Sequence, residues 1–318
     1  MAEDSKPTVR RRVLGTNLRR LREERGLLLE HAAEHLSCNA SKISRIESGR
    51  SPVRPLDLKA LLDLYGVLDQ GAREGWLSLA REGRRQRWWR ALEDQLPRDF
   101  LDLIGLEEDT SYCRGFQPAI IDGLLQTERY AEAVIGGGSP GPLQPNQETM
   151  LKVRLERQKA LTRTEHPIEV WMVMGEAALR QMCGGPEVMR AQLHHLLELA
   201  NLGNVTLQVL PFSVGAYRGG PFPFKIYRFP MPSEMEVVLL ESHMSHAYLE
   251  NPRDIAFHSE IFDRLRATAL GELDSRRMIE GIAREYARES RGDEGAGGDR
   301  LGEEQSQRAE RGLRRGAS

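Results

Sequence analysis

Cysteine, aromatic residues and long apolar runs are scarce in this sequence. Its three cysteines, Cys38, Cys113 and Cys183, lie far apart in a chain of 318 residues, so no disulfide framework is indicated and a reducing compartment is expected. No run approaches the roughly 20 apolar residues that span a bilayer. The basic triplet at 10–12 is not followed by the apolar core of a signal peptide, so no export signal is expected. We therefore expect a cytoplasmic protein with no membrane partner.

Recognisable catalytic motifs are also missing. The sequence contains no Gly-x-Ser-x-Gly elbow, no Walker motif and no dinucleotide fingerprint. His31 and His35 have the i, i+4 spacing of a metal-binding pair, but no third ligand is near, and solvated histidines are the simpler interpretation. His243 and His246, considered with Glu241 and His258, lack the glutamate and helix of a zinc hydrolase motif. We therefore expect no enzyme activity, no cofactor and no metal site.

Charge is distributed unevenly along the chain. The length predicts about two domains. Residues 1–90 contain 19 Lys and Arg against 12 Asp and Glu, a net charge of +7, whereas the remaining residues contain 26 against 35, a net charge of −9. A basic first third indicates a polyanionic partner for that part alone. The acidic remainder argues against a purely structural nucleoid protein.

Four short helices are predicted within residues 13–66. Apolar residues recur at helical spacing near 14–25, 28–36, 40–48 and 55–65. Gly26 and Gly49 are placed to end the first and third helices. Asn39 is a good N-cap for the third. The side chains expected to form the buried stripes are Leu14, Leu18, Leu21, Ala32, Ala33, Leu36, Ile43, Ile46, Leu58, Leu61 and Leu62.

The second and third of these helices have the form of a helix-turn-helix unit. They are joined by a three-residue turn at 37–39, and the third leaves a polar face uncovered. A recognition helix needs such a face, with short side chains and hydrogen-bond donors that reach base edges in the major groove. Two alternatives remain open: the helices serve packing alone, or Arg45 pairs with Glu47 or another carboxylate.

Residues 36–50, Leu-Ser-Cys-Asn-Ala-Ser-Lys-Ile-Ser-Arg-Ile-Glu-Ser-Gly-Arg, closely resemble the recognition unit of the XRE family of repressor-like helix-turn-helix regulators. The resemblance implies double-stranded DNA as partner and a location at the nucleoid. Two departures stand out: Leu29 replaces a usual phosphate-contacting Gln, and Ser37 replaces a usual Gly. The residues expected to contact bases, phosphates or the DNA backbone are Asn39, Ala40, Ser41, Lys42, Ser44, Arg45, Ser48 and Arg50.

The rest of the chain predicts a connector, a mixed domain and a tail. Residues 1–12 are expected to be flexible, 67–94 to form a helical connector, 95–287 an α/β domain and 288–318 a disordered tail. In the connector, Trp88–Trp89 among arginines indicates either packing against the second domain or extra DNA contact, with packing favoured. Overall the fold class is α+β, an all-α repressor-like domain followed by a mixed α/β domain. Strands are expected at Glu169–Met174, Val205–Leu210, Phe224–Phe229 and Val237–Glu241, and helices at 100–106, 147–161, 186–199, 254–269 and 273–287.

Five strings stand out in residues 95–285: Gly-Leu-Leu-Gln-Thr-Glu-Arg-Tyr at 123–130, Arg-Leu-Glu-Arg-Gln at 154–158, Glu-Ala-Ala-Leu-Arg at 176–180, Gly-Pro-Glu-Val-Met-Arg-Ala-Gln-Leu at 185–193, and Asn-Val-Thr-Leu-Gln-Val-Leu-Pro-Phe at 204–212. In this order they resemble a domain of unknown function that follows the helix-turn-helix in many actinobacterial regulators associated with sporulation and antibiotics. The resemblance implies a regulatory domain and a small partner protein encoded by a neighbouring gene.

Together these features predict a sequence-specific transcriptional regulator that binds DNA as a homodimer. One recognition helix reads only a few base pairs, so a paired site is expected. The alternative is a small-molecule receptor or enzyme domain fused to a DNA-targeting module. Trp171, Phe222, Phe224 and Tyr227 can line a pocket, although core packing explains them as well. The last three are also candidate anchors for a partner protein.

Overall fold

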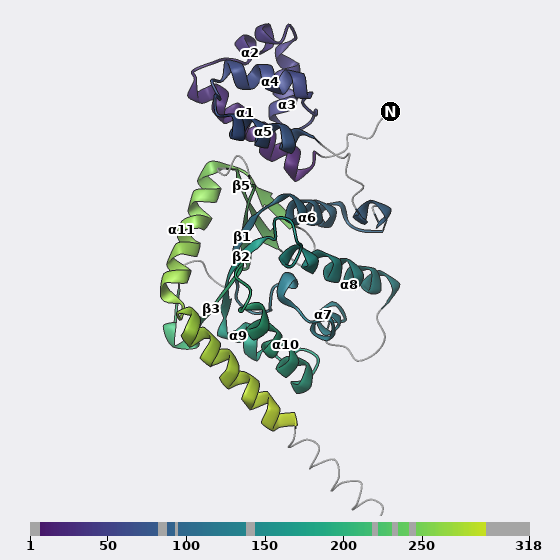
Figure 1. Ribbon diagram of the computed structural model, residues 1–318, viewed down its shortest axis with the longest axis vertical. Coiled ribbons are helices and arrows are strands. Elements are labelled where there is room, and N and C mark those ends of the chain that lie inside the picture. The colour runs from purple at the N-terminus through teal and green to yellow at the C-terminus, as the bar shows by residue number, and fades with distance from the viewer. Residues whose placement is uncertain are drawn as a thin grey trace, which may run out of the picture.

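The computed structural model describes residues 7–81, 88–92, 95–137, 144–217, 222–230, 235–241 and 246–290. An N-terminal helical bundle is followed by a mixed α/β domain built on a six-stranded sheet (Figure 1). The predicted fold class is therefore confirmed. Residues 1–6 and 291–318 of the predicted termini lie outside the described residues, and 288–290 are helical.

The bundle contains the four predicted helices and one more. Asn39 caps the third helix, because its side chain accepts a hydrogen bond from the Lys42 amide at 2.9 Å. Gly26 has a φ of 66° after the first helix, the left-handed conformation that a glycine end favours. The helices are α1 (Val9–Glu24), α2 (Leu29–His35), α3 (Ala40–Glu47), α4 (Pro55–Leu64) and α5 (Gln70–Ala80).

Two predicted boundaries in this region differ from the structure. The first helix begins at Val9, so residues 9–12 are helical, whereas the flexible N-terminus was expected to extend to residue 12. Val9 is buried, which the sequence pattern from residue 13 onward could not indicate. The helix α5, predicted as part of a connector at 67–94, contacts α1 and α4 and buries Trp76. It therefore completes the bundle.

The sheet has the strand order β3-β2-β1-β4-β5-β6. β1 pairs in parallel with β2, and β2 with β3, whereas the other three pairings are antiparallel. All four predicted strands are present. The strands are β1 (Tyr112–Gln117), β2 (Glu169–Gly175), β3 (Val205–Leu210), β4 (Phe224–Arg228), β5 (Glu236–Glu241) and β6 (His246–Leu249).

Two strands, β1 and β6, were not predicted. β1 carries Arg114 and Gly115 at its centre, which interrupts the apolar run expected of a central strand. Gly115 is needed there, because a Cβ atom would lie 2.6 Å from the carbonyl oxygen of Phe224 on β4. β6 has only four residues, none of them buried, so its sequence carries little strand signal.

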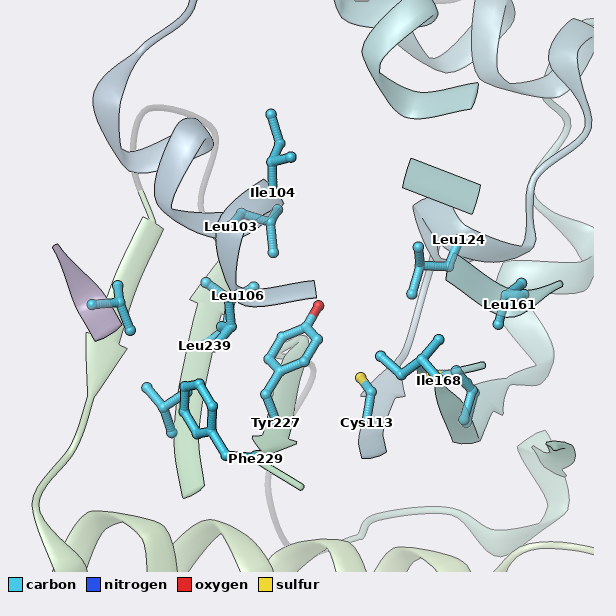
Figure 2. Close-up of a cluster of buried hydrophobic side chains, with 14 of the residues drawn as sticks. Leu103, Ile104, Leu106, Cys113, Leu124, Leu161, Ile168, Tyr227, Phe229 and Leu239 are labelled. Atoms are coloured by element: carbon cyan, nitrogen blue, oxygen red, sulfur yellow. The ribbon is translucent and has the colours of Figure 1, made fainter. Parts of the chain in front are cut away.

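Helices cover both faces of the sheet (Figure 1). One face packs against α11 through Phe116, Val173, Phe224, Ile261 and Phe262. The opposite face packs against the remaining helices, and Figure 2 shows Tyr227 of β4 there, between Leu106 and Cys113. The helices are α6 (Arg98–Asp109), the 3-10 helix η2 (Gly123–Leu125), α7 (Glu128–Ile135), α8 (Pro145–Gln158), α9 (Glu176–Arg180), α10 (Pro186–Leu199), α11 (Pro252–Thr268) and a last helix at 272–290.

Ion pairs from the first turn of α1 hold the bundle against the α/β domain. The Arg10 guanidinium lies 2.7 Å from the carboxylate of Asp109, the last residue of α6. Arg12 lies 2.8 Å from the carboxylate of Glu250, the residue after β6. Arg10 also donates to the carbonyl oxygen of Leu79 in α5 at 2.7 Å. Residues 9–12 therefore form part of the junction between the domains.

Candidate nucleic-acid interface and a buried polar pocket

The helix α3 is held by one apolar face and leaves the other open. Ile43 is fully buried and Ile46 is 3% exposed, and both belong to the bundle core. Ser37, before the helix, has a φ of 49°, a conformation that glycine adopts more easily. Ser37 thus adopts the left-handed conformation although it replaces the glycine that is usual at this position in the regulators that the sequence resembles.

Close backbone approach fixes α3 against α1. A Cβ atom on Gly15 would lie 2.5 Å from the carbonyl oxygens of Ile46 and Glu47. A Cβ atom on Gly49 would lie 2.9 Å from the backbone nitrogen of Arg12. The two glycines therefore let the end of α3 rest directly on α1, which sets the direction of the recognition helix.

A buried ion pair strengthens this contact. Arg22 of α1 donates two hydrogen bonds to the Glu47 carboxylate, at 2.7 and 2.8 Å, and one to the carbonyl oxygen of Leu27 at 2.7 Å. The hydrogen bond that Arg22 donates to Glu47 is the main reason that the pKa of Arg22 is raised. The partner of Arg22 lies 25 residues away, and the periodic pattern of a single helix contains no signal for such a contact.

Most of the predicted DNA-binding residues are exposed with the α/β domain in place. Ala40 and Lys42 are half-buried. The exposed ones are Asn39, Ser41, Ser44, Arg45, Ser48 and Arg50.

The Arg45 side chain is available for a ligand. Among the described residues it forms no ion pair or side-chain hydrogen bond, and Glu47 is turned inward to Arg22. Pairing of Arg45 with Glu47, one of the alternatives, is therefore wrong.

Lys42 and Ser48 make local contacts. The Lys42 ammonium lies 2.7 Å from the carboxylate of Asp57, in the first turn of α4, and is partly exposed. The Ser48 hydroxyl donates to the carbonyl oxygen of Arg45 at 3.3 Å. Asp57 thus balances part of the positive charge expected to face DNA.

The histidine candidates form no metal centre in the part of the chain that is described. No group of three metal-ligating side chains occurs there. His31 Nδ1 accepts a hydrogen bond from the Leu28 amide at 3.1 Å, so this side chain caps α2. His258 Nδ1 lies 2.8 Å from the carbonyl oxygen of Asp254. His243 lies outside the described residues.

Three of the strings that carried the second resemblance meet in the α/β domain. Gln158 of α8 donates to the carbonyl oxygens of Gly123 and Gln126, at 2.9 and 2.8 Å. Gln192 of α10 accepts from the Thr127 amide at 2.6 Å and donates to the carbonyl oxygen of Leu125 at 2.7 Å. These glutamines hydrogen-bond backbone groups of the η2 segment and hold it against α8 and α10.

This segment forms one wall of a polar pocket that the sequence did not predict. The pocket has a volume of about 430 Å³ and lies between α6, η2, α8 and the β1, β4 and β5 strands. Buried ionised groups surround it: Lys225 lies 2.9 Å from Asp122 and 3.1 Å from Glu241. The sequence signal for this site is a lysine between Phe224 and Ile226. Alternation along β4 places its side chain on the opposite face of the strand from those two apolar residues.

The predicted aromatic anchors divide into two groups. Phe224 is 4% exposed and Tyr227 is fully buried, with its hydroxyl donating to Glu107 at 2.9 Å. Neither can anchor a partner, because both belong to the core. Phe222 is 71% exposed. Trp171 is half-buried and donates to the Gln208 side chain at 2.8 Å.

Of the two connector tryptophans, Trp89 packs against the α/β domain, whereas Trp88 is 37% exposed. Trp89 is half-buried, and its indole N–H lies 3.4 Å from the carboxylate of Glu108 on α6. Of the neighbouring arginines, 84, 85 and 87 lie outside the described residues. The geometry of Trp89 agrees with the packing interpretation.

Comparison with known proteins assigns both domains. A helix-turn-helix domain family matches residues 13–76, and a domain of unknown function, DUF5753, matches residues 100–281. None of the curated proteins and none of the solved structures compared with the chain matches it. No helix in the described residues is long and apolar enough to cross a membrane. The helix-turn-helix match supports a DNA-binding regulator, and the chain belongs to the DUF5753 family, whose domain it joins to an N-terminal helix-turn-helix.

Proposed function

We propose that the protein is a sequence-specific transcriptional regulator of XRE type that places α3 in the major groove of DNA. The observation that carries the proposal is the exposed face of α3: Ser41, Ser44 and Arg45 are accessible with the α/β domain in place, and Arg45 has no ion-pair partner among the described residues. Short hydroxyl side chains allow close approach to the bases, and an arginine can donate two hydrogen bonds to one guanine. The protein acts without catalysis, at the nucleoid in the cytoplasm.

The flanking residues have a different role. Arg50 is exposed just after α3, and Lys42 is partly exposed beside Asp57. Such cations bind phosphates, fix the register of the helix and carry no base preference. To bind a phosphate, the Lys42 ammonium must leave the Asp57 carboxylate or contact the carboxylate and the phosphate at the same time.

Substitution of Arg45 tests the base contact. We expect Arg45→Ala to weaken binding to the preferred sequence by about 1–3 kcal/mol, the usual contribution of a bidentate base contact. Binding to unrelated DNA should change much less. Arg190→Ala is the matched control, because it removes the same charge from an exposed position on α10. Equal losses for the two variants on the preferred sequence contradict the assignment.

Substitution of Arg50 tests the phosphate contact. We expect Arg50→Ala to weaken binding to preferred and unrelated DNA by similar factors. The slope of the logarithm of affinity against the logarithm of salt concentration should fall by about 1, since one fewer counterion is released. Fluorescence anisotropy at several salt concentrations measures both effects. An unchanged salt slope removes Arg50 from the interface.

We also propose that the protein binds DNA as a homodimer. Two recognition helices related by a two-fold axis read paired half-sites about one helical turn apart, or a multiple of it. Sedimentation of the protein–DNA complex gives the stoichiometry, and a footprint gives the half-site spacing. A monomer protecting one half-site contradicts this arrangement.

Regulation is assigned to the DUF5753 domain. Its resemblance to domains of actinobacterial regulators supports a small partner protein from a neighbouring gene, and the exposed Phe222 and Phe212 are apolar surface for it. Calorimetry of the full chain with that protein, with Phe222→Ser as the contact variant, tests the idea. No heat and no co-elution leave a small-molecule receptor as the second candidate, which the pocket favours.

A further inference from the structure

The pocket of the α/β domain combines a charged floor with apolar walls. Its volume, about 430 Å³, lies within the usual range for small-molecule sites, roughly 300–1,000 Å³. The polar and charged lining residues are Gln117, Asp122, Gln126, Arg154, Arg157, Lys225, Glu241 and His246. The apolar lining residues are Phe100, Leu103, Ile120, Ile121, Val134 and Pro223.

Two of the three cations at the floor are neutralised by carboxylates. Lys225 is 1% exposed and contacts both Asp122 and Glu241. Arg157 is 6% exposed and donates two hydrogen bonds to Glu107, at 2.6 and 2.7 Å. Both ions thus have the partners that a buried charge requires.

Arg154 is the third cation, and it has no ion-pair partner among the described residues. Its Nη1 donates to the side-chain oxygen of Gln126 at 2.7 Å, a neutral acceptor. Its Nε is buried and has no hydrogen-bond partner among the residues described. Removal from water, and next the charge of Arg157, lower the pKa of Arg154 to about 10. The charges of Asp122, Glu241 and Glu107 offset part of this effect without a hydrogen bond to Arg154 among the described residues, and a ligand that pairs directly with the half-buried guanidinium completes it.

We propose that this pocket binds a small organic anion, whose carboxylate or phosphate group pairs with Arg154 and whose apolar body lies against Phe100, Leu103 and Ile121. Arginine binds carboxylate and phosphate through the same planar donor geometry, so the two sources share one recognition chemistry. The amide nitrogens of Gln117 and Gln126 in the same lining already donate to Asp122 and to the carbonyl oxygen of Ile121, at 3.2 and 2.7 Å, so Arg154 is the donor to the anionic head.

The walls of the pocket lead directly to the DNA-binding bundle. α6 provides Phe100 and Leu103 to the pocket and ends at Asp109, which pairs with Arg10 of α1. β6 begins with the lining residue His246 and is followed by Glu250, which pairs with Arg12. Movement of either wall on ligand binding therefore changes the position of α1 relative to the α/β domain. This part of the inference rests on the proposed DNA-binding function and makes the anion its effector.

Calorimetry of the full chain with matched probes tests the binding. The probes are 4-phenylbutyrate and 4-phenylbutanamide, which differ in charge at nearly equal shape, together with phenyl phosphate and phenol. We expect at least one anion to bind tenfold more tightly than its neutral counterpart. The probe pair that shows the preference tells whether the pocket selects a carboxylate or a phosphate group. No preference for the anion in either pair overturns the proposal.

Variants at Arg154 locate the site. Arg154→Gln should lose the preference for the anion, Arg154→Lys should retain part of it, and the exposed control Arg190→Gln should bind as the parent does. Ile120→Trp, at a lining position that is 39% exposed, should weaken the anion and its neutral counterpart together by filling the pocket. This last variant also decides the matter if Arg154→Gln fails to fold. Unchanged binding in Arg154→Lys and Ile120→Trp places the probe elsewhere and overturns the proposal.

DNA affinity separates this inference from the proposed function. A DNA fragment that carries the preferred sequence of the protein is titrated with the full chain, with and without a saturating concentration of the anion that binds. We expect a change in DNA affinity of at least about fivefold, the lower end of usual allosteric coupling, and none in Arg154→Gln. Ligand binding without an effect on DNA overturns the coupling alone. Absence of DNA binding without any ligand contradicts the proposed function, not the anion site.

Discussion

At the residue scale, single glycines decide how closely α1 and α3 approach. Gly49 has a φ of 71° and touches the backbone of Arg12, whereas Gly26 has a φ of 66° and open space around its Cβ position. A left-handed residue costs roughly 1–2 kcal/mol for any side chain other than glycine. A side chain at position 26 would therefore add backbone strain alone, whereas one at position 49 would add both backbone strain and a steric clash with α1.

This difference gives a stability prediction. Gly26→Ala should lower the free energy of unfolding by about 1 kcal/mol, because an alanine is strained in the left-handed conformation. The lower entropy of the unfolded chain offsets only part of that strain. Gly49→Ala should cost about 1–3 kcal/mol more, since the added Cβ overpacks the contact with α1. Denaturant unfolding followed by circular dichroism measures both. Equal costs would falsify the close-contact account of Gly49.

The Asp122–Lys225 pair gives a pH prediction at the same scale. Burial alone raises the pKa of Asp122, but the charge and hydrogen bond of Lys225 outweigh it and hold this pKa below its ordinary 3.8. The stabilisation is therefore complete above pH 3.8 and is lost as pH falls through the lower folded pKa.

The difference in unfolding free energy between the parent and Asp122→Asn should narrow as pH falls. We expect it to be largest near pH 6 and smaller at pH 3, where the unfolded carboxyl has already taken up its proton. Urea unfolding at a series of pH values gives the comparison. A difference that stays constant from pH 6 to pH 3 contradicts the lowered pKa.

At the scale of elements, the orientation of α3 depends on the buried Arg22–Glu47 pair. Truncation of one member of a buried ion pair leaves the other charge without compensation and costs about 3–5 kcal/mol. Arg22→Ala should show such a loss. Arg19→Ala, which removes an exposed arginine paired to Glu23 on the same helix, should stay within about 0.5 kcal/mol of the parent. Similar losses for both variants contradict a structural role for the buried pair.

Sequence patterns identified the elements whose signal lies within one segment. The helix-turn-helix, the helix at 186–199 and four strands carry periodic apolar residues and recognisable ends, and the structure contains all of them. Elements defined by distant partners were missed. β1 is a strand because Gly115 admits β4, and the start of α1 is ordered because Arg10 and Arg12 meet Asp109 and Glu250. No local pattern records those contacts.

The candidate site divides in the same way. The exposed face of α3 follows from helical spacing, so six predicted contact residues are exposed in the structure. The pocket depends on side chains from α6, η2, α8 and the sheet. Arg154 comes from α8 and Lys225 from β4, 71 positions apart in the chain. Their convergence is a property of topology, which the sequence pattern of neither segment contains.

At the scale of the whole molecule, the two domains are joined by the ion pairs of Arg10 and Arg12. Partly exposed ion pairs contribute modestly, up to about 1 kcal/mol each. The double variant Arg10→Ala, Arg12→Ala should therefore keep both folds while loosening their arrangement. X-ray scattering should show a larger radius of gyration with an unchanged circular dichroism spectrum. An unchanged radius contradicts a junction that depends on these pairs.

Selection from a random DNA pool is the most direct measurement of the central claim, that the exposed face of α3 reads DNA sequence. The full chain, Arg45→Ala and Arg190→Ala are each used to enrich bound fragments, which are then sequenced. We predict that the full chain and Arg190→Ala enrich the same paired motif. Arg45→Ala should lose base preference at one position in each half-site and keep the others. Enrichment of the full motif by Arg45→Ala, or of no motif by the full chain, contradicts the account.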